Sequence, residues 1–228
     1  NYNIIEIGTG CGVLTQIIAE KGANVYAVEI DASLVEFLNR YLFFHKNLQI
    51  VNQDAAAIDY SKVFNGEKTS FIGNLPYNLS VKIFERAAMR DNITAMVFMF
   101  QKEVADRIAA LPCEKAYSSL SVFASYMFDI KKIRDIGGGN FWPNAGVTST
   151  VLKFKPKKER PLDKTCENEF FNFVRQAFRQ KRKILKNNLQ HIENIENILI
   201  NAGLDSRVRA EELEISKFIE LYRIIYDK

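Results

Sequence analysis

Short runs of β-branched and aromatic residues alternate with helix-like stretches along the chain up to Phe154. The helix-like stretches include Val13–Glu20 and 32–44, and the first five strand-like runs are Asn3–Ile7, 25–28, 48–51, 70–73 and 95–100. Strands that alternate with helices in this way predict a parallel sheet with helices on both faces. Ligands of such sheets bind at the carboxyl ends of the strands, where we therefore expect the functional residues.

Two more strand-like runs and a change of composition mark the end of this α/β region. The runs 130–136 and 147–154, separated by three glycines and a Phe-Trp-Pro turn, predict a terminal antiparallel pair. A polar connection bracketed by prolines follows, and from Asn168 onward the pattern is helical, with Gly203 as a helix stop. We therefore expect an α/β domain over 1–157 and a small helical domain over 158–228.

The composition favours a soluble protein whose chemistry depends on a cofactor. No apolar run reaches the roughly 20 residues that a membrane span needs, and no signal sequence opens the chain, so we expect a cytoplasmic location. The three cysteines are too widely spaced for a disulfide framework or a zinc site, and only two histidines are present. We therefore expect reduced thiols, no metal site and a cofactor. Asn1 directly precedes an apolar run, and we expect the native start to lie upstream.

The net charge of +4 comes from one short segment. Residues 175–186 hold six basic residues and no acid, whereas the rest of the chain holds 25 basic and 27 acidic residues. Drawn as one helix, residues 174–189 place Lys181 beside an apolar stripe and the other five basic residues on a neighbouring arc: Arg175, Arg179, Arg182, Lys183 and Lys186. A solvated helix face is the alternative, but the lack of acids favours a site for a polyanion such as RNA.

A glycine-rich loop follows the first predicted strand and leads into a helix. Its sequence is Glu6-Ile7-Gly8-Thr9-Gly10-Cys11-Gly12, in which the glycines let the backbone approach a ligand closely. The loop lacks the third-glycine spacing of the dinucleotide fingerprint, and a carboxylate at Glu6 would repel a pyrophosphate. A ligand with an ammonium group fits better, although an ordinary tight turn is the alternative.

Acidic residues also end the next two predicted strands. Glu29 closes the second strand and Asp54 follows the third, so we expect both carboxylates to converge with Glu6 on one rim of the sheet. A ribose diol, an adenine amine and an amino group would find partners there, and S-adenosylmethionine carries all three. A nicotinamide oxidoreductase is the second interpretation of these residues taken alone.

The tetrapeptide Asn74-Leu75-Pro76-Tyr77 directly follows the fourth predicted strand and shares that rim. Proline fixes the loop, the Asn amide oxygen and a backbone carbonyl accept hydrogen bonds from an exocyclic amine, and Tyr stacks on a base. These properties fit an adenine amine held for methylation, whereas a turn with a core tyrosine is the alternative. Further along, we expect Phe141 to stack on the same base, and we leave Trp142 unassigned.

Taken together, these motifs resemble the bacterial rRNA adenine dimethyltransferase family. The resemblance rests on residues 6–10, 74–80, 101–107 and 175–189, and it spans essentially the whole chain. It implies a Rossmann-like seven-strand methyltransferase sheet that binds S-adenosylmethionine and a helical C-terminal domain. The implied substrate is a pair of adjacent adenosines near the 3′ end of small-subunit rRNA, each methylated twice in a precursor ribosomal subunit. We expect a monomer that does not bind membranes.

The resemblance also assigns roles to single residues. Gly8 would approach the methionine part of the cofactor, Glu29 the ribose and Asp54 the adenine amine. The full cofactor-binding set is Glu6, Gly8, Gly10, Glu29, Ile30, Asp54, Ala55 and Asn74, and the catalytic set is Asn74, Leu75, Pro76, Tyr77 and Phe141.

One part of the sequence departs from the family pattern. Asn144-Ala145-Gly146 stand where the family usually has a proline and a basic residue, which bears on the rigidity of that loop and on a phosphate contact. A second hypothesis of a different class is a ribosome-assembly factor whose binding is the function and whose methylation is secondary.

Overall fold

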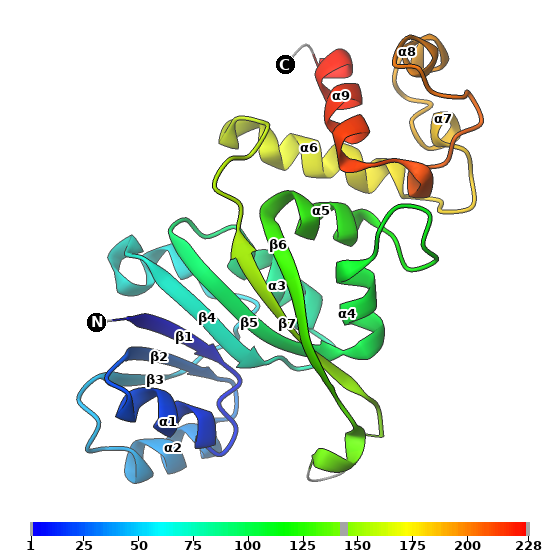
Figure 1. Ribbon diagram of the computed structural model, residues 1–228. Coiled ribbons are helices and arrows are strands. Elements are labelled where there is room, and N and C mark those ends of the chain that lie inside the picture. The colour runs from blue at the N-terminus through cyan, green and yellow to red at the C-terminus, as the bar shows by residue number, and fades with distance from the viewer. Residues whose placement is uncertain (1, 142–145, 227–228) are drawn as a thin grey trace. The chain divides into compact units, whose positions relative to one another are not determined.

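The computed structural model describes residues 2–141 and 146–226, and the chain divides into two compact units. The first unit comprises Asn1–Ala105 and Asp129–Pro156, and the second comprises Asp106–Phe128 and Lys157–Lys228. Figure 1 shows a sheet with helices in the first unit and only helices in the second. Among the described residues, none of the helices combines the length and the apolar character that crossing a membrane requires.

A seven-stranded sheet with the order β3-β2-β1-β4-β5-β7-β6 forms the first unit. Its strands are β1 Asn3–Ile7, β2 Asn24–Glu29, β3 Leu48–Asn52, β4 Thr69–Asn74, β5 Ile93–Gln101, β6 Phe128–Ile136 and β7 Ser149–Pro156. The first five strands pair in parallel, and β7 runs antiparallel to β5. The predicted α/β class and all seven strands are therefore confirmed. The strand order reverses between β1 and β4, which is where sheets of this kind bind ligands.

The parallel strands are connected by short helices. These elements are α1 Val13–Glu20, α2 Ala32–Tyr41, the irregular 3-10 segment Tyr60–Gly66 and α3 Ser80–Ala88, with α4 Lys102–Ala109 and the 3-10 turn Gly138–Asn140 further along. Alternate side chains of β5 point into the core, where Phe98 and Phe100 are fully buried. Phe84 of α3 and Phe154 of β7 stack nearby with a centroid distance of 4.7 Å. This aromatic core fixes α3 on the sheet.

The second unit is all helical, and it includes residues 106–128 as well as the C-terminal region. Its helices are α5 Ser119–Met127, α6 Lys164–Ala177, α7 Leu185–Asn188, α8 Ile195–Asn201, the 3-10 turn Ala210–Glu212 and α9 Ile215–Tyr226. Gly203 follows α8 with a φ of +72°, as expected of a helix stop.

The boundary after Pro156 lies within one residue of the predicted boundary, but residues 106–128 group with the helical unit instead of the sheet domain. The reason is the packing of α5. Phe123 and Tyr126 of this helix contact Phe171 of α6 at centroid distances of 4.8 Å and 5.3 Å. The Tyr126 hydroxyl also donates to Glu167 Oε1 at 3.2 Å. These contacts join segments more than 40 residues apart, so the local pattern did not reveal them.

Candidate active site

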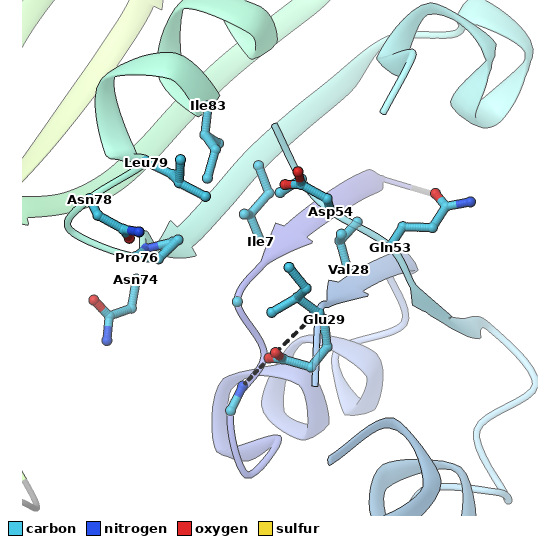
Figure 2. Close-up of a pocket in the computed structure, with 14 residues that line it drawn as sticks. Ile7, Val28, Glu29, Gln53, Asp54, Asn74, Pro76, Asn78, Leu79 and Ile83 are labelled. Atoms are coloured by element: carbon cyan, nitrogen blue, oxygen red, sulfur yellow. Dashed lines mark hydrogen bonds between the residues drawn. The ribbon is translucent and has the colours of Figure 1, made fainter. Parts of the chain in front are cut away.

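A pocket of about 410 Å³ opens at the carboxyl ends of β1 to β4. Its lining residues are Ile7, Gly8, Gly10, Val28, Glu29, Ile30, Gln53, Asp54, Ala55, Asn74, Pro76, Asn78, Leu79 and Ile83. Figure 2 shows Asn74, Pro76 and Asn78 on one side and Glu29, Gln53 and Asp54 on the other. The structure therefore brings together the predicted cofactor residues, except Glu6. Two members of the tetrapeptide 74–77, hereafter the acceptor motif, line the same pocket: Asn74 and Pro76.

Gly8 joins the glycine-rich loop to the end of β4. Its φ is +74°, and a Cβ added there would lie 2.9 Å from the carbonyl oxygen of Asn74. Its own amide donates to Val28 O at 2.9 Å. Only glycine combines this backbone conformation with so close an approach. The cofactor loop and the acceptor motif therefore touch through Gly8.

The Glu29 carboxylate is almost buried, and the protein's own donors surround it. Oε2 accepts from Thr9 Oγ1 at 3.2 Å and from Gly10 N at 3.1 Å. Oε1 accepts from Ile30 N at 2.9 Å and from Asp31 N at 3.1 Å. A carboxylate offers about four acceptor sites. Glu29 therefore holds the glycine-rich loop, and ribose hydroxyls would have to share or replace the Thr9 and Gly10 donors.

Glu6 is the one predicted cofactor residue that does not line the pocket. Alternation along β1 directs its side chain to the sheet face opposite Ile7, and this face is also covered, so Glu6 is 1% exposed. Oε2 has no hydrogen-bond partner among the described residues. Burial raises the pKa of Glu6 to about 7, and the negative charge of Glu29 adds to the shift. Glu6 is therefore a buried acid under the glycine-rich loop.

Asp54 begins a tight turn that forms another wall of the pocket. Its Oδ1 accepts from Ala56 N at 2.8 Å, and its carbonyl accepts from Ala57 N at 2.8 Å. The side chain remains exposed to solvent on the pocket side. This geometry leaves carboxylate surface of Asp54 available to a hydrogen-bond donor in the pocket.

The acceptor motif combines two residues that face the pocket with two that do not line it. Asn74 and Pro76 are exposed and line the pocket, whereas the Leu75 side chain is 1% exposed and belongs to the core. Tyr77 is half-buried, and its hydroxyl lies 2.9 Å from Ser149 Oγ of β7. Leu75 can therefore act on a ligand only through its backbone, and Tyr77 is anchored to the sheet.

Six pocket residues were not predicted from the sequence: Ile7, Val28, Gln53, Asn78, Leu79 and Ile83. Ile7 and Val28 each precede a predicted residue at a strand end, and Asn78 and Leu79 directly follow the motif. Ile83 lies one helical turn beyond Leu79, a spacing that places both on one face of α3. Position next to the motifs was thus the available signal.

The predicted stacking residue Phe141 is half-buried at the end of a 3-10 turn and does not line the pocket. Trp142 and Pro143 lie outside the described residues, as do Asn144 and Ala145 of the departure from the family pattern.

The basic segment is not one helix, which corrects the prediction for 174–189. α6 ends at Ala177, turns follow, and α7 begins at Leu185. The Asn188 side chain stabilises the turn after α6: Nδ2 donates to Ala177 O at 2.7 Å and to Gln180 O at 3.2 Å, and Oδ1 accepts from Gln180 N. A carbonyl that would accept the next helical amide is therefore taken by a side chain. Leu185 and Leu189 are nevertheless buried, as the apolar stripe predicts.

The basic side chains of this segment fall into two groups. Lys186 pairs with Glu196 at 2.9 Å, Arg175 donates to Asn172 Oδ1 at 2.8 Å, and Lys181 donates to Tyr117 O at 3.0 Å. The second group comprises Arg179, Arg182 and Lys183, which are exposed and for which the described residues provide no side-chain partner. Arg179 also lines a polar pocket of about 330 Å³ with Gln176, Gln180, Asn187, Asn188, Gln190 and His191. Fewer basic side chains of this segment are therefore free of protein partners than the sequence indicated.

Within the described part of the chain, no group of three or more His, Cys, Asp or Glu side chains could hold a metal ion. Cys11, Cys113 and Cys166 are all free thiols.

Comparison with known proteins identifies the family. The family described as "Ribosomal RNA adenine dimethylase" matches residues 1–227. The "Ribosomal RNA small subunit methyltransferase A" of Hahella chejuensis is 35% identical over 229 residues, which cover 100% of this chain and 84% of that protein. The protein of the same name from Francisella tularensis subsp. novicida is 39% identical over 222 residues, which cover 96% of this chain and 84% of the relative.

Solved structures agree with the fold. A dimethyladenosine transferase from Plasmodium falciparum has a TM-score of 0.78 at 25% identity, and the match covers 97% of this chain and 88% of the Plasmodium chain. The 23S rRNA methyltransferase ErmE has a TM-score of 0.75 at 20% identity, covers 100% of this chain and 92% of its own, and supports the fold alone. The motifs and the match over the whole chain agree on the family. This chain belongs to the ribosomal RNA adenine dimethylase family.

Proposed function

We propose that this chain transfers methyl groups from S-adenosylmethionine to the exocyclic amine of adenosines in small-subunit rRNA. The acceptors are two adjacent adenosines near the 3′ end, each methylated twice. The observation that supports this proposal best is the pocket in which the acidic ends of β2 and β3 face Asn74 at the end of β4. Family membership supplies the rRNA adenine as the substrate class.

The pocket residues suit S-adenosylmethionine chemically. Asp54 offers an exposed carboxylate to an adenine amine, and Glu29 would accept from a ribose diol that shares or replaces its Thr9 and Gly10 donors. Val28, Ala55 and Ile83 provide apolar surface for a flat base, and a volume of about 410 Å³ lies within the usual range for small-ligand sites. Gly8 and Gly10 allow the backbone to approach the remaining part of the cofactor closely.

The residues at the end of β4 position the acceptor. The cofactor supplies an electrophilic methyl group on a sulfonium. The Asn74 amide oxygen and a neighbouring backbone carbonyl accept hydrogen bonds from the adenine amine, which keeps the nitrogen lone pair out of the ring and directs it to the methyl group. Pro76 restricts the loop through its fixed φ. No strong general base is needed, because the amine proton becomes acidic only once the new bond forms.

The helical unit supplies the RNA contact in this proposal. The exposed Arg179, Arg182 and Lys183 would contact rRNA phosphates, with smaller contributions from Arg175 and Lys186, which have partners within the protein. We further propose that the enzyme acts as a cytoplasmic monomer on a precursor ribosomal subunit.

The test is methylation of immature small ribosomal subunits by the full chain with labelled S-adenosylmethionine, followed by mapping of the methyl groups on the rRNA. We expect label on two adjacent adenosines near the 3′ end. Label on DNA or on protein, with none on rRNA, would contradict the proposal. Binding to subunits without any methyl transfer would favour an assembly factor instead.

A further inference from the structure

We propose that Tyr60 is a positioning residue for the adenine side of the cofactor pocket, an inference that rests on the proposed function of that pocket. Its hydroxyl donates to the turn that carries Asp54 and Ala55, hereafter the 54–58 turn. Two arginines, one in α3 and one just after it, donate to backbone carbonyls of the 54–58 turn and of the residues that follow it. This arrangement ties the adenine wall of the pocket to the helix that directly follows the acceptor motif.

The contact of Tyr60 with the turn is direct and buried. The hydroxyl donates to the Ala55 carbonyl at 2.7 Å, and Ala55 lines the pocket beside Asp54. Tyr60 is 2% exposed, and its ring meets Phe71 of β4 edge to face at a centroid distance of 5.2 Å. The ring is thus fixed by the core, so its hydroxyl presents a rigid donor to the turn.

The segment that contains Tyr60 has little regular structure of its own. Residues 60–66 form an irregular 3-10 segment in which Phe64 and Asn65 adopt positive φ values of 53° and 50°. Backbone carbonyls in such a segment need partners from elsewhere in the protein. Side chains of α3 and of the residues just after it supply those partners.

Two guanidinium groups bind carbonyls of this segment and of the turn that precedes it. Arg86 of α3 donates to Ala57 O at 3.0 Å and also to Ile58 O. Arg90, which is buried and directly follows the C-cap of α3, donates to Val63 O and Glu67 O, both at 2.9 Å, and also to Tyr60 O. One arginine thus holds the end of the turn, and the other holds Tyr60 itself.

The same helix reaches the acceptor side of the pocket. α3 begins at Ser80, shortly after the acceptor motif, and Leu79 and Ile83 line the pocket. Ser80 Oγ donates to Tyr77 O at 3.2 Å, which links the helix start to the motif. A shift of the turn that carries Asp54 and Ala55 relative to α3 would therefore change the distance between this turn and the acceptor motif.

Tyr60→Phe removes only the hydroxyl and leaves the packing against Phe71 in place. Binding of S-adenosylhomocysteine and of S-inosylhomocysteine, in which an oxygen replaces the adenine amine, is measured by calorimetry. We expect Tyr60→Phe to weaken S-adenosylhomocysteine binding about tenfold, and S-inosylhomocysteine binding much less, because the turn no longer holds Asp54 at the amine. The preference for adenine should therefore fall.

Tyr117→Phe is the matched control. Tyr117 is also 2% exposed, and its hydroxyl donates to a backbone carbonyl, Leu213 O, at 3.0 Å within the helical unit. This variant loses the same group and should lose comparable thermal stability, yet it should retain the wild-type preference between the two ligands. Equal changes in both variants would mean that the Tyr60 hydroxyl acts only on stability, and this result would overturn the inference.

Arg86→Lys tests the α3 part of the inference, because one ammonium cannot donate to both carbonyls with the geometry of a guanidinium. We expect a smaller loss of adenine preference in the same direction, and an unchanged preference would show that α3 does not position the turn. A wild-type chain that binds neither ligand, or both equally, would contradict the proposed function itself. Wild-type discrimination that Tyr60→Phe retains would contradict only this inference.

Discussion

Glu29 both stabilises the glycine-rich loop and faces the cofactor pocket, so its removal should have two effects. Glu29→Ala should weaken cofactor binding by about 1.5 to 3 kcal/mol, roughly tenfold to a hundredfold in affinity, because a charged hydrogen-bond partner is removed. It should also lower the free energy of unfolding, since Thr9 and the amides of Gly10, Ile30 and Asp31 lose their shared acceptor. Calorimetric titration and urea unfolding separate the two effects.

Asp31→Ala provides the control for Glu29. The Asp31 carboxylate caps α2 by accepting from Ser33 N at 2.8 Å, and it does not line the pocket. This variant should lose stability alone. Unchanged cofactor affinity in Glu29→Ala would remove Glu29 from the binding site.

Glu6 should make the stability of the protein depend on pH. Its pKa is about 7 in the folded chain and 4.5 as its ordinary value, so the folded state holds a proton that the unfolded state has lost between these two values. Stability from the neutral carboxyl is thus full below about pH 4.5 and falls as pH rises through about 7. Above pH 7 the loss should approach about 3 kcal/mol.

Glu6→Gln should remove this dependence because the amide does not ionise. Urea unfolding of both proteins at pH 5 and pH 8 gives the measurement, and the variant should gain stability relative to wild type at the higher pH. A stability difference that is the same at both pH values would show that Glu6 does not ionise at a cost in the folded state.

At the scale of secondary-structure elements, the end of β4 separates chemistry from binding. Asn74→Ala should abolish methylation while subunit binding persists, because its exposed amide lines the pocket and the contact with Gly8 is made by the backbone carbonyl. Methyl transfer to immature subunits and filter binding of the same subunits give the two measurements. Asn78→Ala, the same change at another exposed amide of the pocket, should retain most activity. Full activity of Asn74→Ala would exclude its role as the amine acceptor.

The turn between α6 and α7 decides which cations face outward. Replacing Arg179, Arg182 and Lys183 by Ala should weaken subunit binding and reduce its salt dependence, by roughly 0.7 to 0.9 in slope for each phosphate that is no longer neutralised. Filter binding across a salt series measures this slope. Replacing Arg175 and Lys186, which already have partners in the protein, should change it less. Normal binding of the triple variant at every salt concentration would rule out this surface as the RNA-binding site.

Across the whole molecule, the two proposed activities, methyl transfer and RNA binding, belong to different units. The pocket and the acceptor motif lie entirely in the sheet unit, and the exposed cations lie in the helical unit. Variants of the sheet unit should therefore leave subunit binding intact, and variants of the helical unit should leave cofactor binding intact.

The α/β class, the seven strands and the position of the glycine-rich loop could be predicted from the amino-acid sequence. These features are local: the strands follow from runs of β-branched residues, and the carboxyl ends of parallel strands necessarily meet at one edge. Glycines and acids placed directly after those strands were therefore bound to share a rim. Gly8, Glu29, Asp54 and Asn74 accordingly lie together in the pocket.

Features that depend on contacts between distant segments could not be predicted and became visible in the folded chain. Alternation alone could not show that Glu6 is buried away from the pocket, because both faces of a central strand are covered. The Asn188 side chain binds the turn after α6 across 11 residues, and Tyr126 joins α5 to α6 across 41 residues. The hydrogen bond from Tyr60 to Ala55 is short in sequence, but the ring is placed by Phe71 of a neighbouring strand. Periodicity records which side chains are apolar, whereas packing decides which partners they meet.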